Sequence, residues 1–341
     1  MALKRIVRTA LLWPLLMLLA ATGAKAQTDA SAYGVLDWSY GRFEPSGLYR
    51  EMRFNSNSMT ASFVGVNVKH GFEDGWTPGL TLETFVRLQD FQTGRNERDP
   101  LLSRNAFVSL GSQYGTLRVG RLQTFLFDTT ARFNALGNSL VFSPAMRHLF
   151  ASGDLEGIQG DVYWDRGVSY QTPAIEGALE GLRANLMYAG GGSDERGDYT
   201  GGSVIYARGL FAAALSAQRV HVDDGIRDPT IENTVQIGAS YIFGFAKLFG
   251  LYTRINDKGL DVRSNIGTVG AEFPLGPGQV LAQIGVTTAK GPAVDRKHTS
   301  TSVAYLYAYD SQTDFYVAAM DDRVRGQTRG VSVAAGVRWR F

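Results

Sequence analysis

Apolar and polar residues alternate at period two along most of this chain. The last twelve residues, 330–341, show the pattern most clearly, with one apolar face and one small, polar or charged face. The apolar face consists of Val331, Val333, Ala335, Val337, Trp339 and Phe341. Such a strand is suited to a wall between lipid and water. Because the pattern continues to the final residue, where soluble domains usually fray, we expect this strand to pair with residues 33–38 and close a sheet.

The same alternation predicts sixteen strands. They lie near residues 31–41, 61–72, 80–91, 102–112, 115–122, 166–172, 181–190, 201–209, 210–221, 232–243, 245–255, 264–273, 279–289, 299–309, 313–322 and 330–341. Tight hairpins, as at 112–115 and 310–312, alternate with longer polar connections, as at 42–60 and 290–298. Short periplasmic turns and long extracellular loops alternate in this way in outer-membrane barrels. We therefore predict an all-β fold, a 16-stranded antiparallel transmembrane β-barrel with both termini in the periplasm.

The period-two pattern also assigns faces. In 80–91 it places Glu83 and Arg87 inside, and in 232–243 it places Gln236 and Ser240 inside. In the last strand it directs the odd positions to lipid and leaves Arg338 and Arg340 at the periplasmic mouth.

Residues 122–165 lack the two-residue pattern. They are too long for a simple connection, and their many phenylalanine and leucine residues argue against disorder. A barrel of sixteen strands leaves an open lumen. We expect this third extracellular loop to fold into the lumen and narrow it.

The N-terminal residues predict export. Basic residues precede an apolar run from Ala10 to Ala21, and Ala24-Lys25-Ala26 supplies a cleavage site, so residues 1–26 are predicted to be a signal peptide and 27–341 a single barrel domain. A membrane-anchoring helix is the alternative, but the run is short and contains Pro14. Removing the signal peptide changes the formal charge from +2 to −2, so the basic precursor carries no indication of nucleic-acid binding.

Catalytic and metal-binding motifs are not found in the sequence. There is no cysteine, and the four histidines do not have the spacing of a metal site. No G-x-S-x-G or phosphate-binding loop occurs. We therefore expect no enzyme activity and no cofactor.

Several short motifs resemble trimeric Gram-negative porins, especially those of neisserial and other β-proteobacterial type. The segment 113–122 followed by Asp128-Thr129 is similar to the junction between the fifth strand and the inward loop of that family. Further similarities are at residues 33–37, 72–75, 104–110, 168–173 and the terminal Phe341. Together they cover nearly the whole mature chain. Where such porins often carry arginine in the second strand and before the tyrosine at 170, this chain has none at 63–66 or 168–169.

The resemblance implies a homotrimer in the Gram-negative outer membrane, in which acidic loop residues face a basic wall across a narrow eyelet. The implied basic wall is Arg104, Arg118 and Arg121, with Arg87 as a further candidate. The loop candidates are Asp128, Arg132, Arg147, Asp154 and Glu156. It also implies that Phe341 is a signal for the β-barrel assembly machinery, and that outer-membrane lipid and lipopolysaccharide surround the barrel.

The predicted function is passive diffusion of small hydrophilic solutes and ions. Opposed charges across a water-filled gap orient dipolar solutes and disfavour large apolar ones. Two alternatives remain open: a substrate-specific channel with a binding site in the long loop, and a structural surface barrel whose lumen is plugged. Ion selectivity also remains open.

Overall fold

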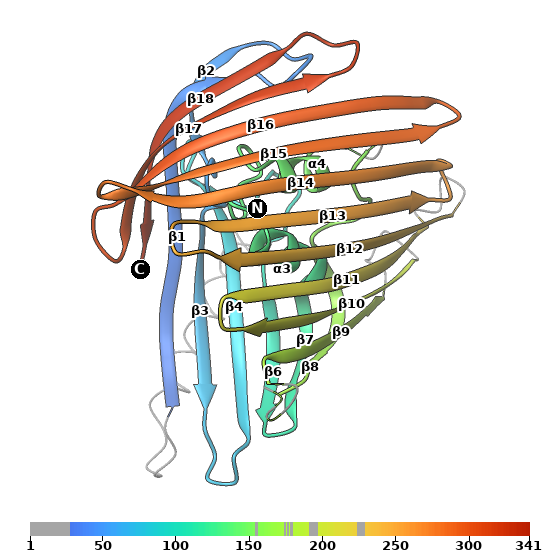
Figure 1. The fold of residues 1–341 in the computed structure, drawn as a ribbon. Coiled ribbons are helices and arrows are strands. Elements are labelled where there is room, and N and C mark those ends of the chain that lie inside the picture. The colour runs from blue at the N-terminus through green and yellow to red at the C-terminus, as the bar shows by residue number, and fades with distance from the viewer. Residues whose placement is uncertain are drawn as a thin grey trace, which may run out of the picture.

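A closed antiparallel barrel forms the body of the molecule (Figure 1). The computed structural model describes residues 28–341 except 154–155, 174, 176, 178–179, 191–196 and 224–228. The strands are β1 (Thr28–Phe43), β2 (Glu51–Ser56), β3 (Phe63–His70), β4 (Thr77–Arg87), β5 (Gln92–Thr93), β6 (Ala106–Ser112), β7 (Gly115–Gln123), β8 (Tyr163–Gln171), β9 (Leu182–Gly190), β10 (Asp198–Arg208), β11 (Phe211–Val222), β12 (Thr230–Ile242), β13 (Lys247–Asp257), β14 (Val262–Leu275), β15 (Gly278–Gly291), β16 (Val294–Ala308), β17 (Thr313–Val324) and β18 (Gly330–Arg340).

These segments fill sixteen positions around the barrel. The second position holds both β2 and β3, because each pairs with β1, and β5 is a two-residue extension that pairs only with β4. β1 pairs with β18, with Val35 opposite Arg340 and Trp38 opposite Val337, so the sheet closes on itself. The predicted number of strands, their order and the closing pair are confirmed.

The interruption between β2 and β3 has a local cause. The buried carboxylate of Asp37 on β1 accepts the backbone N–H groups of Ser58, Met59 and Thr60 at 3.0–3.2 Å, and it accepts the Tyr316 hydroxyl at 2.8 Å. The side chain thereby satisfies backbone donors that would otherwise belong to the strand ladder.

The strand lengths differ from prediction at one rim. β15 ends at Gly291 and β16 begins at Val294, so the connection predicted at 290–298 is a two-residue turn. The strands continue here with a polar outward face that includes Lys290 and Lys297, while the inward Ala289 and Val294 pack with Val262, so the pattern of an apolar outer face is lost.

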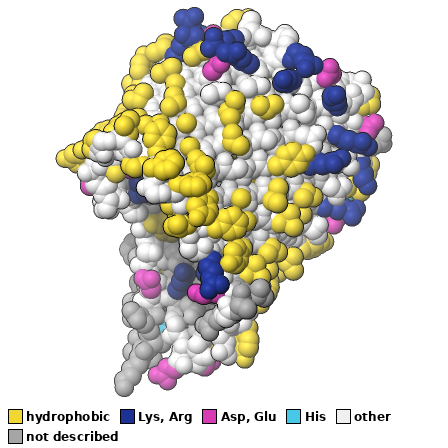
Figure 2. All heavy atoms as spheres, in the orientation of Figure 1, with side chains coloured by type: hydrophobic (Ala, Val, Ile, Leu, Met, Phe, Trp, Pro, Cys, Tyr) yellow, Lys and Arg dark blue, Asp and Glu magenta, His cyan; other side chains and the backbone are white. Residues whose placement is uncertain are grey.

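Alternating burial confirms the predicted faces. On β12, Val235 and Ile237 are exposed while Gln236 and Ser240 are buried, and on β18, Val333 and Trp339 are exposed while Ala334 is buried. Figure 2 shows apolar side chains across much of the outer surface, with Lys and Arg side chains along its top and right edges. Within the described residues, no helix is long and apolar enough to cross a membrane.

Candidate functional site

Two short helices lie in the connection between β7 and β8: α3 (Phe125–Arg132) and α4 (Pro144–Phe150). Each begins at a hydroxyl side chain. Thr124 accepts the N–H of Phe127, and Ser143 accepts the N–H of Met146, both at 3.3 Å, while Pro144 occupies the first turn of α4. Hydroxyl caps and an N-terminal proline favour helix starts at these positions.

α3 is docked on the inward face of β10–β12. Thr129 Oγ1 donates to Gln236 Oε1 at 2.8 Å, and the Gln236 amide donates to Thr130 and Thr253 at 2.8 and 2.9 Å. Phe133 follows the helix and packs over Gly238, where an added Cβ would lie 2.9 Å from the ring. Because the neighbouring residues of β12 face outward, these contacts lie inside the barrel.

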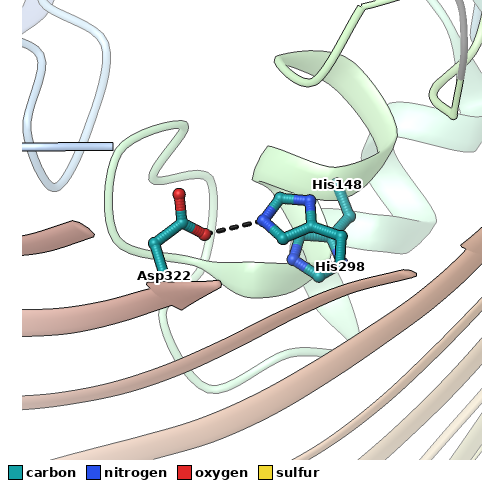
Figure 3. Close-up of side chains that lie close together, drawn as sticks. All are labelled: His148, His298 and Asp322. Atoms are coloured by element: carbon teal, nitrogen blue, oxygen red, sulfur yellow. Dashed lines mark hydrogen bonds and ion pairs between the residues drawn. The ribbon is translucent and has the colours of Figure 1, made fainter. Parts of the chain in front are cut away.

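α4 is docked on β14–β16 through a buried polar cluster (Figure 3). The ring nitrogens of His148 lie 2.7 Å from Thr287 Oγ1 and 2.8 Å from Ser300 Oγ. The His148 ring stacks on that of His298, with centroids 3.9 Å apart. Burial, and then the charge of His298, lower the pKa of His148, so the loop histidine is neutral.

His298 is held between two carboxylates. Its Nδ1 lies 2.9 Å from Glu156 and its Nε2 lies 2.6 Å from Asp322. Carboxylate oxygens only accept, so both ring nitrogens carry a proton and the ring is an imidazolium. Asp322 also accepts from Arg147 at 3.3 Å and from the backbone N–H of Ser46 at 2.9 Å. This loop anchor (Arg147, His148, Glu156, His298, Asp322) joins the β7–β8 connection to the wall.

The loop anchor does not have the geometry of a metal centre, although one atom each of His148, His298 and Asp322 lie within 4.8 Å of one another. The two imidazole rings are stacked at 24°, so their in-plane lone pairs do not converge on one point. Each ring nitrogen already contacts a hydroxyl or a carboxylate. We therefore assign the cluster a structural role.

A second polar network lies on the wall facing α3. The buried carboxylate of Glu83 on β4 forms an ion pair with Arg104 and accepts the Tyr33 hydroxyl at 2.5 Å and the Asn105 amide at 2.9 Å. Arg104 also stacks over Phe63, with its guanidinium carbon 3.8 Å from the ring centroid.

Gln123 connects this wall to α3. Its backbone N–H donates to Asn105 Oδ1 at 3.0 Å, its side-chain amide donates to Asp128, and its carbonyl accepts the Tyr163 hydroxyl at 2.5 Å. The hydrogen bonds therefore run without a break from β1 to the helix, which fixes the position of Asp128 relative to Glu83 and Arg104.

Two cavities lie on either side of this network. One, of about 490 Å³, is lined by Lys69, Glu83, Arg118, Gln123 and Asp128 among others. The other, of about 590 Å³, is lined by Arg95, Arg104, Asp161, Tyr163 and Leu140 among others. Both therefore lie between the β7–β8 connection and the wall.

Of the predicted wall arginines, Arg104 and Arg118 line these cavities. Arg118 donates to Gln171 at 3.1 Å and lies over the ring of Phe107. Arg121 is buried beside them: it donates to the backbone carbonyl of Ser103 at 3.1 Å and pairs with Asp161 and Asp165 at 3.2 and 2.8 Å. Arg121 belongs to the lining of neither cavity, although its partner Asp161 lines the second, and its role in the basic wall stays a prediction.

Arg87 ends β4 and pairs with Asp90 at 3.3 Å, and it belongs to the lining of neither cavity.

The predicted loop residues also lie in different places. Asp128 lines the first cavity, and Arg132 is exposed one turn later on α3. Arg147 and Glu156 do not face the open lumen, because they belong to the loop anchor, where Glu156 is fully buried and also contacts Arg296 at 3.2 Å. Asp154 lies outside the described residues.

Sequence reasoning missed Lys69, Gln123 and Tyr163 as lining residues. The position of Lys69 could have been found from the sequence, since period two along its strand places it on one face with Gly65 and Asn67. The position of Tyr163 could not, because this residue follows an irregular segment.

One acidic residue in the lining, Asp128, has a pKa that burial shifts toward neutral pH. Asp128 lines the first cavity, and desolvation by the nearby protein raises its pKa to about 6 against the opposing effects of Gln123 and Arg118. At the other cavity, the ion pair with Asp99 and Asp161 keeps Arg95 charged.

Comparisons with known proteins agree on one family. The model of the Gram-negative porin family matches residues 14–327. Outer membrane porin protein 32 of Delftia acidovorans is 29% identical over 317 residues, which cover 88% of this chain and 86% of the relative. The solved anion-selective porin from Comamonas acidovorans aligns with a TM-score of 0.77 and 21% identity, over 92% of this chain and 100% of that one. The trimer form of OmpT from Vibrio cholerae aligns with a TM-score of 0.69 and 13% identity, over 92% and 99%.

Proposed function

This chain belongs to the Gram-negative porin family and forms an outer-membrane channel for passive diffusion, and we propose that the channel is a general-diffusion pore with a weak preference for anions. We place its constriction between α3 and the wall of β3, β4, β6 and β7. Residues 122–165 then form the constriction loop. Solutes pass without a covalent step and without a cofactor.

The balance of charge around the two cavities carries the proposal. Their charged lining residues are the basic Lys69, Arg95, Arg104 and Arg118 and the acidic Glu83, Asp128 and Asp161, which leaves one positive charge in excess at neutral pH. An excess of one sign in a narrow pore enriches ions of the other sign. The similar porin from Comamonas acidovorans is anion-selective, which supports the same direction.

The placement of these charges explains why the preference is weak. Glu83 is paired with Arg104, so the two nearly cancel at a distance, and Arg118 and Asp128 face the same cavity. The remaining field is transverse to the pore axis. It orients dipolar solutes without strongly rejecting either sign of ion.

Reversal potential in a salt gradient across a planar bilayer tests the proposal. We expect the sign of an anion-preferring channel, a shift toward cations in R118Q and a shift toward anions in D128N. A reversal potential of cation sign in the wild type would refute the preference. A membrane that stays sealed at every voltage would instead indicate a plugged scaffold, and saturable block by one class of solute would indicate a substrate-specific channel.

We further propose that three barrels associate, in keeping with the trimeric neighbour among the solved structures. An outward aromatic group on the first two strands suits a contact between barrels: Phe54 lies 5.3 Å from Trp38 and 4.8 Å from Tyr40 between ring centroids. Mass measurement of the detergent-solubilised protein tests this stoichiometry. Cleavage after residue 26 and recognition of Phe341 by the assembly machinery complete the proposal.

A further inference from the structure

Apolar side chains line much of the second cavity, the one of about 590 Å³ that Arg104 and Asp161 border. Six of its lining residues are phenylalanine, tyrosine, leucine or isoleucine: Phe85, Phe127, Leu140, Phe150, Ile158 and Tyr163. The interior of an outer-membrane channel is generally polar, so the passage of water and ions alone does not explain this lining. Leu140 and Phe150 keep part of their surface exposed. Because apolar surface in contact with water is unfavourable, the cavity favours a solute with an apolar part.

Two aromatic pairs border this cavity, one from the loop and one from the wall. On the loop, the ring centroids of Phe127 and Phe150 are 5.2 Å apart and the rings are tilted by 54°. On the wall, the centroids of Phe85 on β4 and Tyr163 on β8 are 5.6 Å apart, with the rings at 79°. Aromatic rings attract one another in offset and edge-to-face arrangements. A planar ring in the cavity therefore has aromatic side chains to contact on both the loop and the wall.

The charged side chains that line the second cavity are all in ion pairs. Arg95 pairs with Asp99 and Asp161 at 2.8 and 2.6 Å, and Arg104 pairs with Glu83. A charged solute would have to compete with these partners, and separating a partly buried ion pair costs binding free energy. A neutral solute leaves the pairs intact. The charges of the cavity therefore favour an uncharged solute.

Three asparagines supply neutral hydrogen-bonding groups to the same cavity: Asn57, Asn96 and Asn138. The Oδ1 atoms of Asn57 and Asn96 accept the backbone N–H groups of Ser62 and Arg98 at 2.5 and 2.8 Å. Within the described part of the chain, the NH₂ groups of Asn57 and Asn96 and the whole Asn138 amide have no hydrogen-bond partner. A side-chain amide both donates and accepts, so these groups suit hydroxyl or carbonyl substituents on a solute.

The size and place of the cavity suit a single substituted ring that arrives from outside. An apolar cavity of about 150 Å³ can hold benzene, so about 590 Å³ has room for a ring, its substituents and water. The lining comes largely from the β2–β3, β4–β6 and β7–β8 connections, at the end of the barrel where porins have their extracellular loops. Asn96 and Gly160 in this lining are exposed, so a solute can reach the cavity. The first cavity instead includes Thr77 and Thr116, beside the short turns.

We propose that the second cavity binds small neutral aromatic solutes that carry hydroxyl or carbonyl groups, such as phenols. The ring contacts Phe150 on the loop and Phe85 on the wall, and a substituent forms a hydrogen bond with Asn138. Binding is reversible and involves no covalent step. The place of this site at the entrance of the permeation path rests on the proposed function, whereas the binding itself can be measured without ion flow.

Equilibrium binding of resorcinol to the detergent-solubilised protein, followed by nuclear magnetic resonance of the ligand, tests the inference. F150L keeps an apolar side chain but removes the ring, and N138A removes an amide that has no partner in the fold. One aromatic contact or one hydrogen bond contributes about fivefold in affinity, so we expect each variant to bind about fivefold more weakly. The matched control is F125L, which removes a ring of the same loop that lines the first cavity, and it should bind like the wild type.

Two analogues of resorcinol define the class of solute. The saturated cyclohexanediol should bind the wild type about fivefold more weakly, and meta-hydroxybenzoate should bind no more tightly than resorcinol. Equal resorcinol binding by wild type, F150L and N138A would overturn the site, as would an equal loss in F125L. Tighter binding of meta-hydroxybenzoate would overturn the neutral class, and equal binding of cyclohexanediol would overturn the aromatic one.

Two separate measurements keep the readings distinct. Wild-type β-sheet circular dichroism of the three variants would show that a loss of binding is not unfolding. The reversal potential of the wild type tests the anion preference independently, so failure of the binding site and failure of the proposed function give different results.

Discussion

Replacing Asp322 by asparagine should release the β7–β8 connection from the wall. The Asp322 side chain is 3% exposed, and each of its oxygens has two donors: Ser300 and His298 face Oδ1, and Ser46 and Arg147 face Oδ2. An asparagine side chain has one acceptor oxygen and one NH₂ group. In either orientation the NH₂ group therefore meets two donors, and the charge that balances His298 is gone.

The magnitude follows from the burial of the cluster. Removing one partner of a buried ion pair costs about 3–5 kcal/mol. The contacts of His148 with Thr287 and Ser300 remain, each contributing about 1 kcal/mol, so α4 stays docked most of the time. With tenfold per 1.4 kcal/mol, a loss of about 3 kcal/mol raises the population of the undocked loop roughly a hundredfold.

Hydrogen exchange measured by mass spectrometry reports this population directly. The N–H groups of Arg147 and Ala151 donate within α4 at 2.9 Å, and that of Ile158 donates to Leu149 at 3.0 Å. These amides should exchange about a hundredfold faster in D322N.

The neighbouring Asp321 supplies the matched control, because it pairs at the outer rim with Arg323 and Arg329. Exchange within α4 should be unchanged in D321N. Unaltered exchange in D322N, or equal acceleration in both variants, would refute the role of the loop anchor.

Three further outcomes are expected. The pKa of Asp128 is raised to about 6, so lowering the pH from 7.5 to 5 neutralises its carboxylate and removes a negative charge from the lumen. We therefore expect the reversal potential of the wild type to shift toward anions. D128N should show the shifted value at both pH values. G238A places a Cβ 2.9 Å from Phe133, so we expect a loss of about 1–3 kcal/mol of stability in thermal unfolding, and an unchanged midpoint would contradict this packing. R104Q leaves the buried Glu83 without its cation and should move the reversal potential toward cations, whereas R104K should restore most of the wild-type value.

The strands of the barrel wall could be predicted from sequence because the pattern that defines them, the alternation of apolar and polar residues, is local. Residues two apart share a face, so period two alone identifies strands, faces and the outward Val235 and Ile237. The position of Arg121 escaped this rule: the register of β7 against β8 shifts between Gly120 and Leu122, and Gly120 has a φ of 144°. A bulge of this kind leaves no clear signature in the residue pattern.

The loop could be located in the sequence, but its contacts could not be predicted. Its mixed composition indicated a packed segment, yet Glu156 meets His298 across 142 residues, and Arg147 meets Asp322 across 175. Such pairs depend on the curvature of the whole barrel. Among the candidate charges for the eyelet that the structure describes, Arg104, Arg118 and Asp128 line the cavities there.

Polar residues on the inward wall therefore serve two physical purposes. On β12 and β13, Gln236 and Thr253 are nearly fully buried because they dock α3, and on β15 and β16, Thr287 and Ser300 dock His148. These buried polar groups are satisfied only when the loop is in place, so its position is set by hydrogen-bond geometry as well as by apolar packing. The connection also contacts the opposite wall, where Gln123 donates to Asn105 and Ser139 donates to Ser58, but charged side chains such as Arg118 line the cavity that remains there. The lumen is therefore asymmetric: the two helices are docked on β10–β12 and β14–β16, and Arg118 and Arg104 line the cavities on the other side.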